Sequence, residues 1–419
     1  MNLGSTIRPG KATTQAVAHA GTEVASHSWL YMKIDRKRVT SVTERHMLNC
    51  QHNKAWSGDG EMKSHTIVFS IFLTLILVSC STTPTPNTPP ASTPTAVVRE
   101  VEKLSGADPL PSWNDGNAKQ AIIAFVKTTT DKANPNFVPA EDRIATFDQD
   151  GTTWVEHPMY TQLQFIIDRV HDLSAQHPEW SSKPLFRGLL IGDVEAIAKA
   201  TDSDLAELSK ATQVDMPVEQ FRSLAKDWIT TAKDKRYDKP YTQLVYQPML
   251  EVMQYLRDNG YRTYIVTGGG QEFVRVYSQQ VYGIPTDEVI GSALETQYGY
   301  NKDGRAILSR RAKILLDNNN QGKAQDIYLF LGKRPHAAFG NSTGDQQMLE
   351  YTQGVGGATL EMLVLHDDAQ REYAYGPAQG LPDTHFGKFT QALYDEAKGK
   401  GWTVISMKND WKKIFAWEK

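Results

Sequence analysis

The sequence predicts an α/β fold with a doubly wound parallel sheet and a helical segment inserted after its first strand. A short β-rich run ends in two carboxylates, Asp148 and Asp150, which suits the edge of a sheet. A helical pattern at residues 249–258 leads into an alternating strand at 261–267, as helices and strands follow one another in parallel sheets. Between these two strands the pattern is mainly helical, which places the insertion.

The N-terminal part of the chain differs from the rest. Residues 1–61 have no sustained apolar periodicity, whereas residues 62–80 begin with Met62 and Lys63 and continue into an apolar run. That run is shorter than the roughly 20 residues that a bilayer span requires, so it is typical of a signal peptide. Its end, Leu-Val-Ser-Cys, indicates a bacterial lipoprotein box with Cys80 as the acylated residue. On this interpretation we expect translation to start at Met62, so that residues 1–61 come from a mis-assigned start. The alternative is that residues 1–61 are a cytoplasmic extension and the apolar run is a signal anchor.

Repeated prolines fill residues 81–105, which therefore form a semi-extended tether instead of a helix. The folded domain is expected at 106–419. A tether of this kind suits a lipid anchor, because it holds the folded part away from a membrane surface. We therefore expect the protein in the cell envelope, facing the periplasm or the exterior.

Cysteine usage and charge exclude several functions. The two cysteines of the chain are Cys50 and Cys80, so the folded part has neither disulfides nor thiolate chemistry. Residues 1–79 hold 9 of the 45 Lys and Arg and 5 of the 48 Asp and Glu, so 36 basic and 43 acidic side chains follow them, a net charge of −7. A mildly acidic chain without a basic run argues against a nucleic-acid partner.

The other elements follow from apolar spacing and turn residues. Helices are predicted at residues 117–130, within a segment at 153–245, and at 249–258, 271–282 and 386–398. Strands are predicted at residues 261–267, 289–297, 305–315, 337–340, 359–366 and 402–407, with the second and third paired around a turn at 301–304.

The two carboxylates after the first strand indicate chemistry. Side chains alternate along a strand, so Asp148 and Asp150 point the same way if strand geometry persists, and Gly151 then lets the chain turn away. Two unpaired like charges inside a sheet would be destabilising. The pair is therefore predicted to meet a cation or a phosphoryl group at the carboxyl edge of the sheet. A surface turn or a calcium loop is the alternative.

The strand at 261–267 ends in Thr267, whose hydroxyl is followed by three glycines. Without side chains at Gly268 and Gly269, their backbone N–H groups can approach an anion closely. This predicts a phosphate-binding loop, and a merely flexible loop is the alternative.

Four motifs in order carry a family resemblance: D-x-D-G-T at 148–152, T-G-G-G at 267–270, G-K at 322–323 and G-N-S-T-G-D at 340–345. Their order and spacing resemble the haloacid dehalogenase-like hydrolases, and within them the phosphoserine phosphatase-like branch. The resemblance covers roughly residues 141–365. The D-x-D-G-T motif is specific, whereas the others are informative through their order.

The resemblance implies roles for these residues. Asp148 attacks phosphorus to form an aspartyl-phosphate, and Asp150 protonates the leaving alcohol and later activates water. Thr267 binds the phosphoryl group. Lys323 stabilises Asp148 and the phosphoryl charge, with Lys313 and Lys333 as competing candidates. Dehalogenating members lack a carboxylate at the position of Asp150, so its presence favours phosphate esters. The helical segment at 153–245 corresponds to a mobile cap.

The fourth motif departs from the family pattern, in which a second carboxylate follows the first glycine. Gly340 is followed here by Asn341, and the motif keeps its carboxylate at Asp345. We expect Mg²⁺ to be bound by Asp148, the backbone carbonyl of Asp150, and Asn341 or Asp345, because Mg²⁺ prefers oxygen ligands. The loss of one negative charge predicts weakened affinity, and a metal-independent or inactive protein is the alternative.

The leading prediction is a lipid-anchored, Mg²⁺-dependent phosphomonoesterase that acts on a small phosphorylated metabolite. A binding lipoprotein on a catalytically weak scaffold is the alternative, and phosphotransfer to another alcohol is a third. Trp154 and Glu156 follow the nucleophile loop, and an aromatic face beside a carboxylate suits a cationic amine. This favours an amino-alcohol or amino-acid phosphate such as phosphocholine or phosphoserine, although Trp154 packing a cap hinge is an alternative reading.

Overall fold

The computed structural model describes residues 108–193, 195–199 and 201–418. The predicted upstream segment at 1–61, the signal peptide with Cys80 and the tether at 81–105 lie outside this range and stay predictions. In the described part, none of the helices combines the length and the apolar character that a membrane crossing demands.

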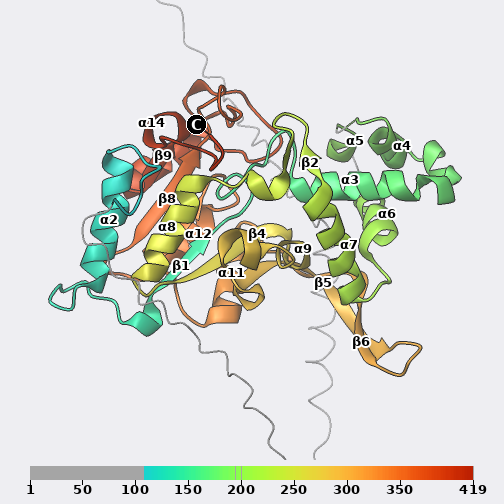
Figure 1. Cartoon of the computed structure of the whole chain (residues 1–419), viewed down its shortest axis with the longest axis horizontal. Coiled ribbons are helices and arrows are strands. Elements are labelled where there is room, and N and C mark those ends of the chain that lie inside the picture. The colour runs from blue at the N-terminus through green and yellow to red at the C-terminus, as the bar shows by residue number, and fades with distance from the viewer. Residues whose placement is uncertain (1–107, 194, 200, 419) are drawn as a thin grey trace, which may run out of the picture. The chain divides into compact units, whose positions relative to one another are not determined.

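A seven-stranded sheet forms the centre of the described part (Figure 1). Its order is β6-β5-β4-β1-β7-β8-β9, and every neighbouring pair is parallel except β5 and β6. The strands are β1 Ile144–Phe147, β4 Arg262–Gly270, β5 Val289–Tyr300, β6 Ala306–Leu316, β7 Ala337–Gly340, β8 Leu360–Leu365 and β9 Thr403–Ser406. From β1 the chain first builds one side of the sheet and then the other, which confirms the predicted doubly wound α/β fold.

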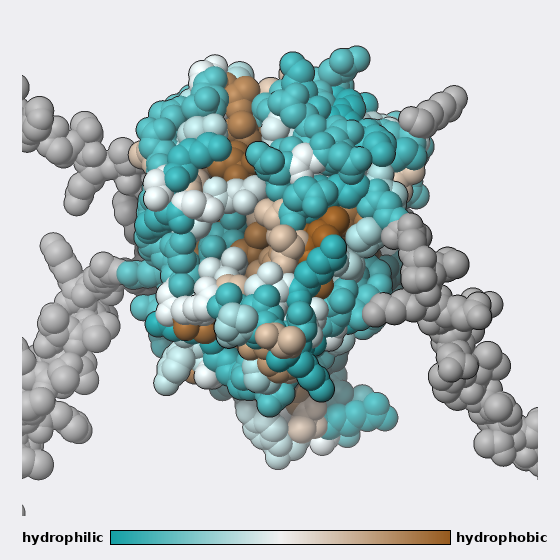
Figure 2. Space-filling model, turned by 90° about the vertical axis from the view of Figure 1, so that its left-hand side faces the viewer, coloured by the Kyte–Doolittle hydropathy of each residue, from teal (hydrophilic) through white to brown (hydrophobic). Residues whose placement is uncertain are grey.

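The strands feed two apolar cores, because successive side chains point to opposite faces. Ala145 and Phe147 face a core shared with α2 and α8, and the ring of Phe147 stacks on Phe339 with centroids 4.4 Å apart. Ile144 faces the other core, with α11, α12 and α13. These helices are α2 Asn117–Thr130, α8 Gln247–Asp258, α11 Gln321–Leu331, α12 Gln346–Gln353 and α13 Gln391–Lys400. The face in Figure 2 is mainly hydrophilic and interrupted by narrow apolar patches.

The predicted helical insertion follows β1 and lies at one side of the sheet, away from α2 (Figure 1). It contains the helices α3 Thr161–Leu173, α4 Pro184–Leu190, α5 Glu195–Ala198, α6 Asp202–Gln213 and α7 Val218–Thr231, and the short antiparallel strands β2 Lys233–Asp234 and β3 Lys239–Pro240. The chain enters and leaves this segment side by side. Val155 N donates to Leu244 O (3.2 Å), and Tyr246 N donates to Thr153 O (2.8 Å).

Around the second motif the structure differs from the prediction. β4 does not end at Thr267 but continues through the glycines to Gly270, with an irregular register between these two residues. The predicted helix at 271–282 is two short helices, α9 Gln271–Val274 and α10 Ser278–Tyr282. Tyr277 separates them with φ −129° and stacks its buried ring on Trp154. Tertiary packing of this aromatic ring therefore overrides the local helical pattern.

The C-terminal boundaries also differ. The helix predicted at 386–398 is α13, which begins only after Thr390, because the Thr390 hydroxyl accepts a hydrogen bond from Leu393 N and caps the helix. Residues 386–389 are thereby left outside the helix, in a bend where Gly387 has φ +63°. The last strand ends at Ser406 and is followed by the short helix α14 Met407–Asp410.

Candidate active site

Loops and strand ends at the carboxyl edge of the sheet gather most of the predicted site residues around one cavity, whose lining does not include Asn341 or Trp154. Asp148 and Asp150 come from the loop after β1, Thr267 from β4 and Asp345 from the loop after β7, and Lys323 lies in the first turn of α11. Residues from four places in the sequence therefore share one site.

Lys323 links the first and fourth motifs. Its ammonium donates to Asp148 Oδ1, to Asp345 Oδ1 (2.6 Å) and to Val266 O (2.9 Å), and the residue is only 2% exposed. The competing candidates lie on the surface, where Lys313 pairs with Glu295 and Lys333 with Asp142. Lys323 is thus the lysine that the fold brings to the proposed nucleophile.

Asp345 uses both of its oxygens within the protein. Oδ1 accepts from Lys323, and Oδ2 accepts from the backbone N–H groups of Asn341 (2.9 Å) and Ser342 (3.0 Å). The carboxylate thereby fixes the turn after β7. Asp345 lines the cavity and each carboxylate oxygen can accept more than one contact, so Asp345 and Asn341 both remain candidates for the metal ligand of the fourth motif.

The orientation of the Asn341 amide is set by its neighbours. Nδ2 donates to Glu156 Oε1 (2.7 Å), so Oδ1 must point to the other side, where it accepts from Thr152 Oγ1 (3.0 Å). The same hydroxyl lies 3.4 Å from Asp148 Oδ2, the oxygen that Lys323 does not hold. Asn341 Oδ1 and Asp148 Oδ2 therefore both lie within reach of the Thr152 hydroxyl.

The turn between these groups requires glycine. Gly151 has φ +76°, and a Cβ at this position would lie 2.1 Å from Asn341 Nδ2 and 2.3 Å from Glu156 Oε1. Any side chain here would push Asn341 away from Asp148. Gly151 of the D-x-D-G-T motif thus allows the turn and also leaves room for Asn341 of the fourth motif.

Burial raises the pKa values of acidic side chains in the site. Burial, helped by the Asp345 carboxylate, raises the pKa of Asp148 to about 8 against the opposing effect of Lys323. Burial also raises the pKa of Glu156 well above its usual range. Four carboxylates and a single ammonium border the cavity, so the site carries excess negative charge. A divalent cation would relieve that excess.

The donor set fits Mg²⁺, which takes carboxylate, carboxamide, carbonyl and water oxygens. Asp148, the carbonyl of Asp150, and Asn341 or Asp345 could supply these oxygens. In the part of the chain that the structure describes, no cluster of three or more His, Cys, Asp or Glu is placed to hold a metal ion. A Mg²⁺ site here would therefore need an amide or backbone oxygen beside the carboxylates, and its affinity stays a prediction.

Asp150 is held through one oxygen. Its Oδ1 accepts from Trp154 Nε1 (2.7 Å), and the residue lines the cavity. Burial raises the pKa of Asp150 to about 6 against the opposing effect of this hydrogen bond. Near neutral pH the group therefore exchanges protons readily, as a general acid must.

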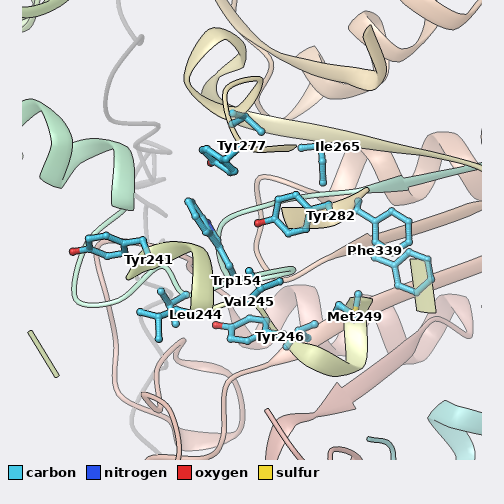
Figure 3. Packing of buried hydrophobic residues seen from close by; sticks show 14 of the residues in the cluster. Trp154, Tyr241, Leu244, Val245, Tyr246, Met249, Ile265, Tyr277, Tyr282 and Phe339 are labelled. Carbon is cyan, nitrogen blue, oxygen red and sulfur yellow. The ribbon is translucent and has the colours of Figure 1, made fainter. Parts of the chain in front are cut away.

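Trp154 does not line the cavity. It is 1% exposed and stacks on Tyr277 with ring centroids 5.0 Å apart, within a cluster that includes Leu244, Val245 and Tyr246 (Figure 3). The expectation that its face meets a substrate is therefore corrected in favour of the hinge-packing reading. Its contribution to the site is the hydrogen bond that orients Asp150.

The glycine loop is itself held in place. Thr267 Oγ1 accepts from Gly269 N (3.0 Å), Gly268 O accepts from Ser292 Oγ (2.9 Å), and Thr267 O accepts from Asn318 Nδ2 (2.9 Å). Of the two N–H groups predicted to meet an anion, that of Gly269 is thus directed at Thr267. Gly268, Gly269 and Thr267 all line the cavity.

The decisive comparison is with protein families. Residues 145–350 match the family model of the haloacid dehalogenase-like hydrolases. These residues form a haloacid dehalogenase-like hydrolase domain. The protein is accordingly a hydrolase, as the sequence predicted.

Solved structures resemble the chain only distantly. A conserved protein of unknown function from Anaerococcus prevotii DSM 20548 is 14% identical, with 71% of this chain and 94% of that chain covered and a TM-score of 0.45. A protein of unknown function from Bordetella pertussis Tohama I is 16% identical (63% and 97% covered, TM-score 0.39). A phosphoserine phosphohydrolase-like protein from Francisella tularensis subsp. tularensis SCHU S4 is also 16% identical (54% and 88%, TM-score 0.30). No curated protein matched the sequence. The family assignment therefore rests on the domain match.

The haloacid dehalogenase-like domain is completed by residues beyond its matched range. Tyr375 OH donates to Glu156 Oε1 (2.8 Å), and Lys388 O accepts from Thr343 N (3.0 Å). His366 Nε2 lies 2.7 Å from Gly151 O and supports the nucleophile turn. His366 ends the strand predicted at 359–366, so the rule that selected Asp148 would have found it. Tyr375 had no comparable signal, because it lies in a loop without a motif.

Three polar cavity residues outside the motifs were also missed by the sequence analysis, and Leu163 lines the cavity beside them. Tyr160 and Gln162 come from the start of the insertion, and Asn319 comes from the loop before α11. In the sequence, Tyr160 reads as part of an apolar helical face. Gln162 and Asn319 are neutral polar residues outside any motif, so only the fold places them beside the cavity.

Proposed function

We propose that this hydrolase is a Mg²⁺-dependent phosphomonoesterase that acts on a small phosphorylated metabolite through an aspartyl-phosphate at Asp148. The arrangement of Asp150 supports this most directly. One of its oxygens is fixed by Trp154, it lines the same cavity as Asp148, and its pKa of about 6 suits proton transfer to a leaving alcohol. A halide leaving group would need no such acid.

In the proposed reaction, an oxygen of Asp148 attacks phosphorus and the bond between phosphorus and the ester oxygen breaks. The ester oxygen takes the proton of Asp150 and leaves as an alcohol. Water then attacks the aspartyl-phosphate and gives a proton to Asp150, so that inorganic phosphate leaves and Asp148 is regenerated.

The other residues of the site would orient the phosphoryl group and neutralise its negative charge. Lys323 and the Thr267 hydroxyl border the place of the phosphoryl group, where Lys323 would offset its negative charge. Asp148, the Asp150 carbonyl and a side-chain oxygen of the fourth motif would hold Mg²⁺, which when bound supplies further neutralisation of the phosphoryl oxygens. The proposal is tested by assaying the purified protein with Mg²⁺ against a broad panel of phosphate monoesters. A complete lack of phosphate release would refute it.

The substrate is proposed to be an amino-alcohol or amino-acid phosphate, on the strength of Glu156 alone. Glu156 lines the cavity and offers a carboxylate to a cationic group. The cation–π part of the earlier expectation is dropped, because Trp154 is buried away from the cavity.

Replacing this carboxylate should separate substrates by charge. Glu156→Ala is expected to raise KM for amine-bearing phosphates by roughly tenfold, the effect of losing one charged hydrogen bond, and to change KM less for neutral esters of equal size. Steady-state kinetics on paired substrates measure this, with Glu179→Ala on the exposed surface of the insertion as control. An equal loss for both classes would leave Glu156 a partner of Asn341 and remove the amine from the proposal.

A binding protein on a weakened hydrolase scaffold is the second candidate, favoured by the neutral Asn341 in the fourth motif. Calorimetry with Mg²⁺ and the phosphate mimic BeF₃⁻ separates the two. Joint binding of both supports the enzyme, whereas absence of both supports the binder. Phosphotransfer to an alcohol instead of water is distinguished by product analysis in the presence of added alcohols.

We also propose that the protein is lipid-anchored through Cys80 and faces the periplasm or the exterior, as the lipoprotein box and the proline-rich tether favour. Cys80→Ala should abolish incorporation of a labelled fatty acid and release the protein from the membrane fraction. Equal labelling of the parent and the variant would disprove the anchor at this residue.

A further inference from the structure

Gln162, in the first turn of α3, has a buried donor that nothing in the described part of the chain satisfies. The residue is 7% exposed and lines the cavity. Its Oε1 accepts from Gly270 N (2.7 Å), which fixes the orientation of the amide, and Nε2 has no hydrogen-bond partner. A buried donor without a partner costs about 1–3 kcal/mol. Such a group in a cavity wall is therefore expected to find its acceptor in a bound molecule.

The amide lies beside the reacting groups. A side-chain carbon at Gly269 would be 3.2 Å from Thr267 Oγ1, 3.3 Å from Gln162 Oε1 and 3.8 Å from Asp150 Oδ2. Thr267 Oγ1, Gln162 Oε1 and Asp150 Oδ2 thus all lie close to Gly269. Asp150 is the proposed acid for the ester oxygen, so Gln162 stands on the leaving-group side of the phosphoryl site.

The charges around the cavity decide which acceptor suits this donor. Among the residues that line it, the one lysine or arginine is Lys323, whose ammonium already donates to three oxygens. Asp150 and Glu156 border the same space and would repel a carboxylate on the leaving group. A neutral amide donor in an acidic pocket suits an uncharged oxygen, such as a hydroxyl or an ether.

We propose that Gln162 is a specificity-determining residue whose Nε2 donates a hydrogen bond to an uncharged oxygen that the leaving group carries next to the ester bond. The inference rests on the proposed phosphomonoesterase function and narrows it: it favours amino-alcohol phosphates over amino-acid phosphates, whose leaving group carries a carboxylate. Within the class of small phosphate esters, the enzyme prefers those of alcohols with a neighbouring hydroxyl or ether oxygen over those with a neighbouring carboxylate or no acceptor.

The test compares two esters that differ by one hydroxyl group, 2-hydroxypropyl phosphate and propyl phosphate. The parent protein should show a kcat/KM roughly 3- to 10-fold higher for the hydroxylated ester, the effect of one neutral hydrogen bond. In Gln162→Met, which keeps the side-chain length but removes the donor, this ratio should fall to about one. Gln164→Met is the matched control, because Gln164 lies on the same helix, outside the cavity wall, and donates to Asp168.

The ratio of kcat/KM for the two esters distinguishes a specificity role of Gln162 from a structural one. Losing the contact with Gly270 would disturb the glycine loop for both esters alike and leave the ratio unchanged, so an equal loss overturns the proposal. A parent protein that hydrolyses both esters equally well also overturns it. If Gln162→Met unfolds at a lower temperature than the parent, Gln162→Asn, which withdraws the amide by one methylene, must show the same loss of ratio. Hydrolysis of neither ester, nor of any other monoester, by the parent would instead be a failure of the proposed function itself.

Discussion

Asp148→Asn should lower kcat for every phosphate monoester by about a thousandfold or more, because the amide cannot form the aspartyl-phosphate. The substitution keeps the size of the side chain and removes a negative charge from a site with four carboxylates. We therefore expect the fold to survive, and a thermal melt checks this. The assay is phosphate release under saturating substrate with Mg²⁺.

The matched control for this experiment is Asp142→Asn. Asp142 lies just before β1, is half-exposed and pairs with Lys333 at the surface, so its loss should leave kcat unchanged. An active Asp148→Asn protein would move the nucleophile to another residue. Trapping of BeF₃⁻ by the parent and its loss in the variant give a second readout that is independent of the substrate.

Lys323→Met is expected to destabilise the protein strongly, because it removes the one ammonium from a buried acidic cluster. Asp148 and Asp345 would then face each other without a cation, and breaking a buried ion pair in this way costs about 3–5 kcal/mol. Urea unfolding in the presence of a metal chelator measures the loss. Lys333→Met, at an exposed ion pair, should change the free energy of unfolding by less than about 0.5 kcal/mol.

The destabilisation by Lys323→Met should depend on pH in a defined direction. Asp148 already has a raised pKa of about 8, and without Lys323 that pKa rises further. A carboxyl with a raised pKa binds a proton in the folded state that the unfolded chain has released, so stability falls as pH rises. The difference begins as the pH rises through about 8, so the variant should lose more stability at about pH 9.5 than at about pH 7. A loss that is equal at both values would show that Lys323 stabilises through packing.

Much of the site could be predicted because its residues follow strand ends. Asp148, Thr267 and Asn341 each come at or just after a parallel strand, and parallel strands present their carboxyl ends at one edge. The choice of Lys323 was less certain from the sequence, because Lys313 and Lys333 lie near it in the chain. Its burial between Asp148 and Asp345 is what separates it from Lys313 and Lys333.

Side-chain direction was harder to predict than position. Trp154 is adjacent in sequence to the nucleophile loop, yet its ring turns into the core while its Nε1 reaches Asp150. Gln162 lies outside every motif, yet it lines the cavity. In both cases the outcome depends on which partners the fold brings near, such as Tyr277 for the tryptophan and Gly270 for the glutamine.

The sequence by itself determined the doubly wound sheet, the helical insertion after β1 and the order of the four motifs, because periodicity and strand-end residues are local properties of the chain. Only the tertiary structure decided that Asn341 turns its oxygen toward Thr152, that Tyr375 reaches Glu156 and that Gln162 is left with an unpaired donor. These contacts join residues far apart in the sequence. Their geometry is set by packing across the sheet edge, which no local pattern records.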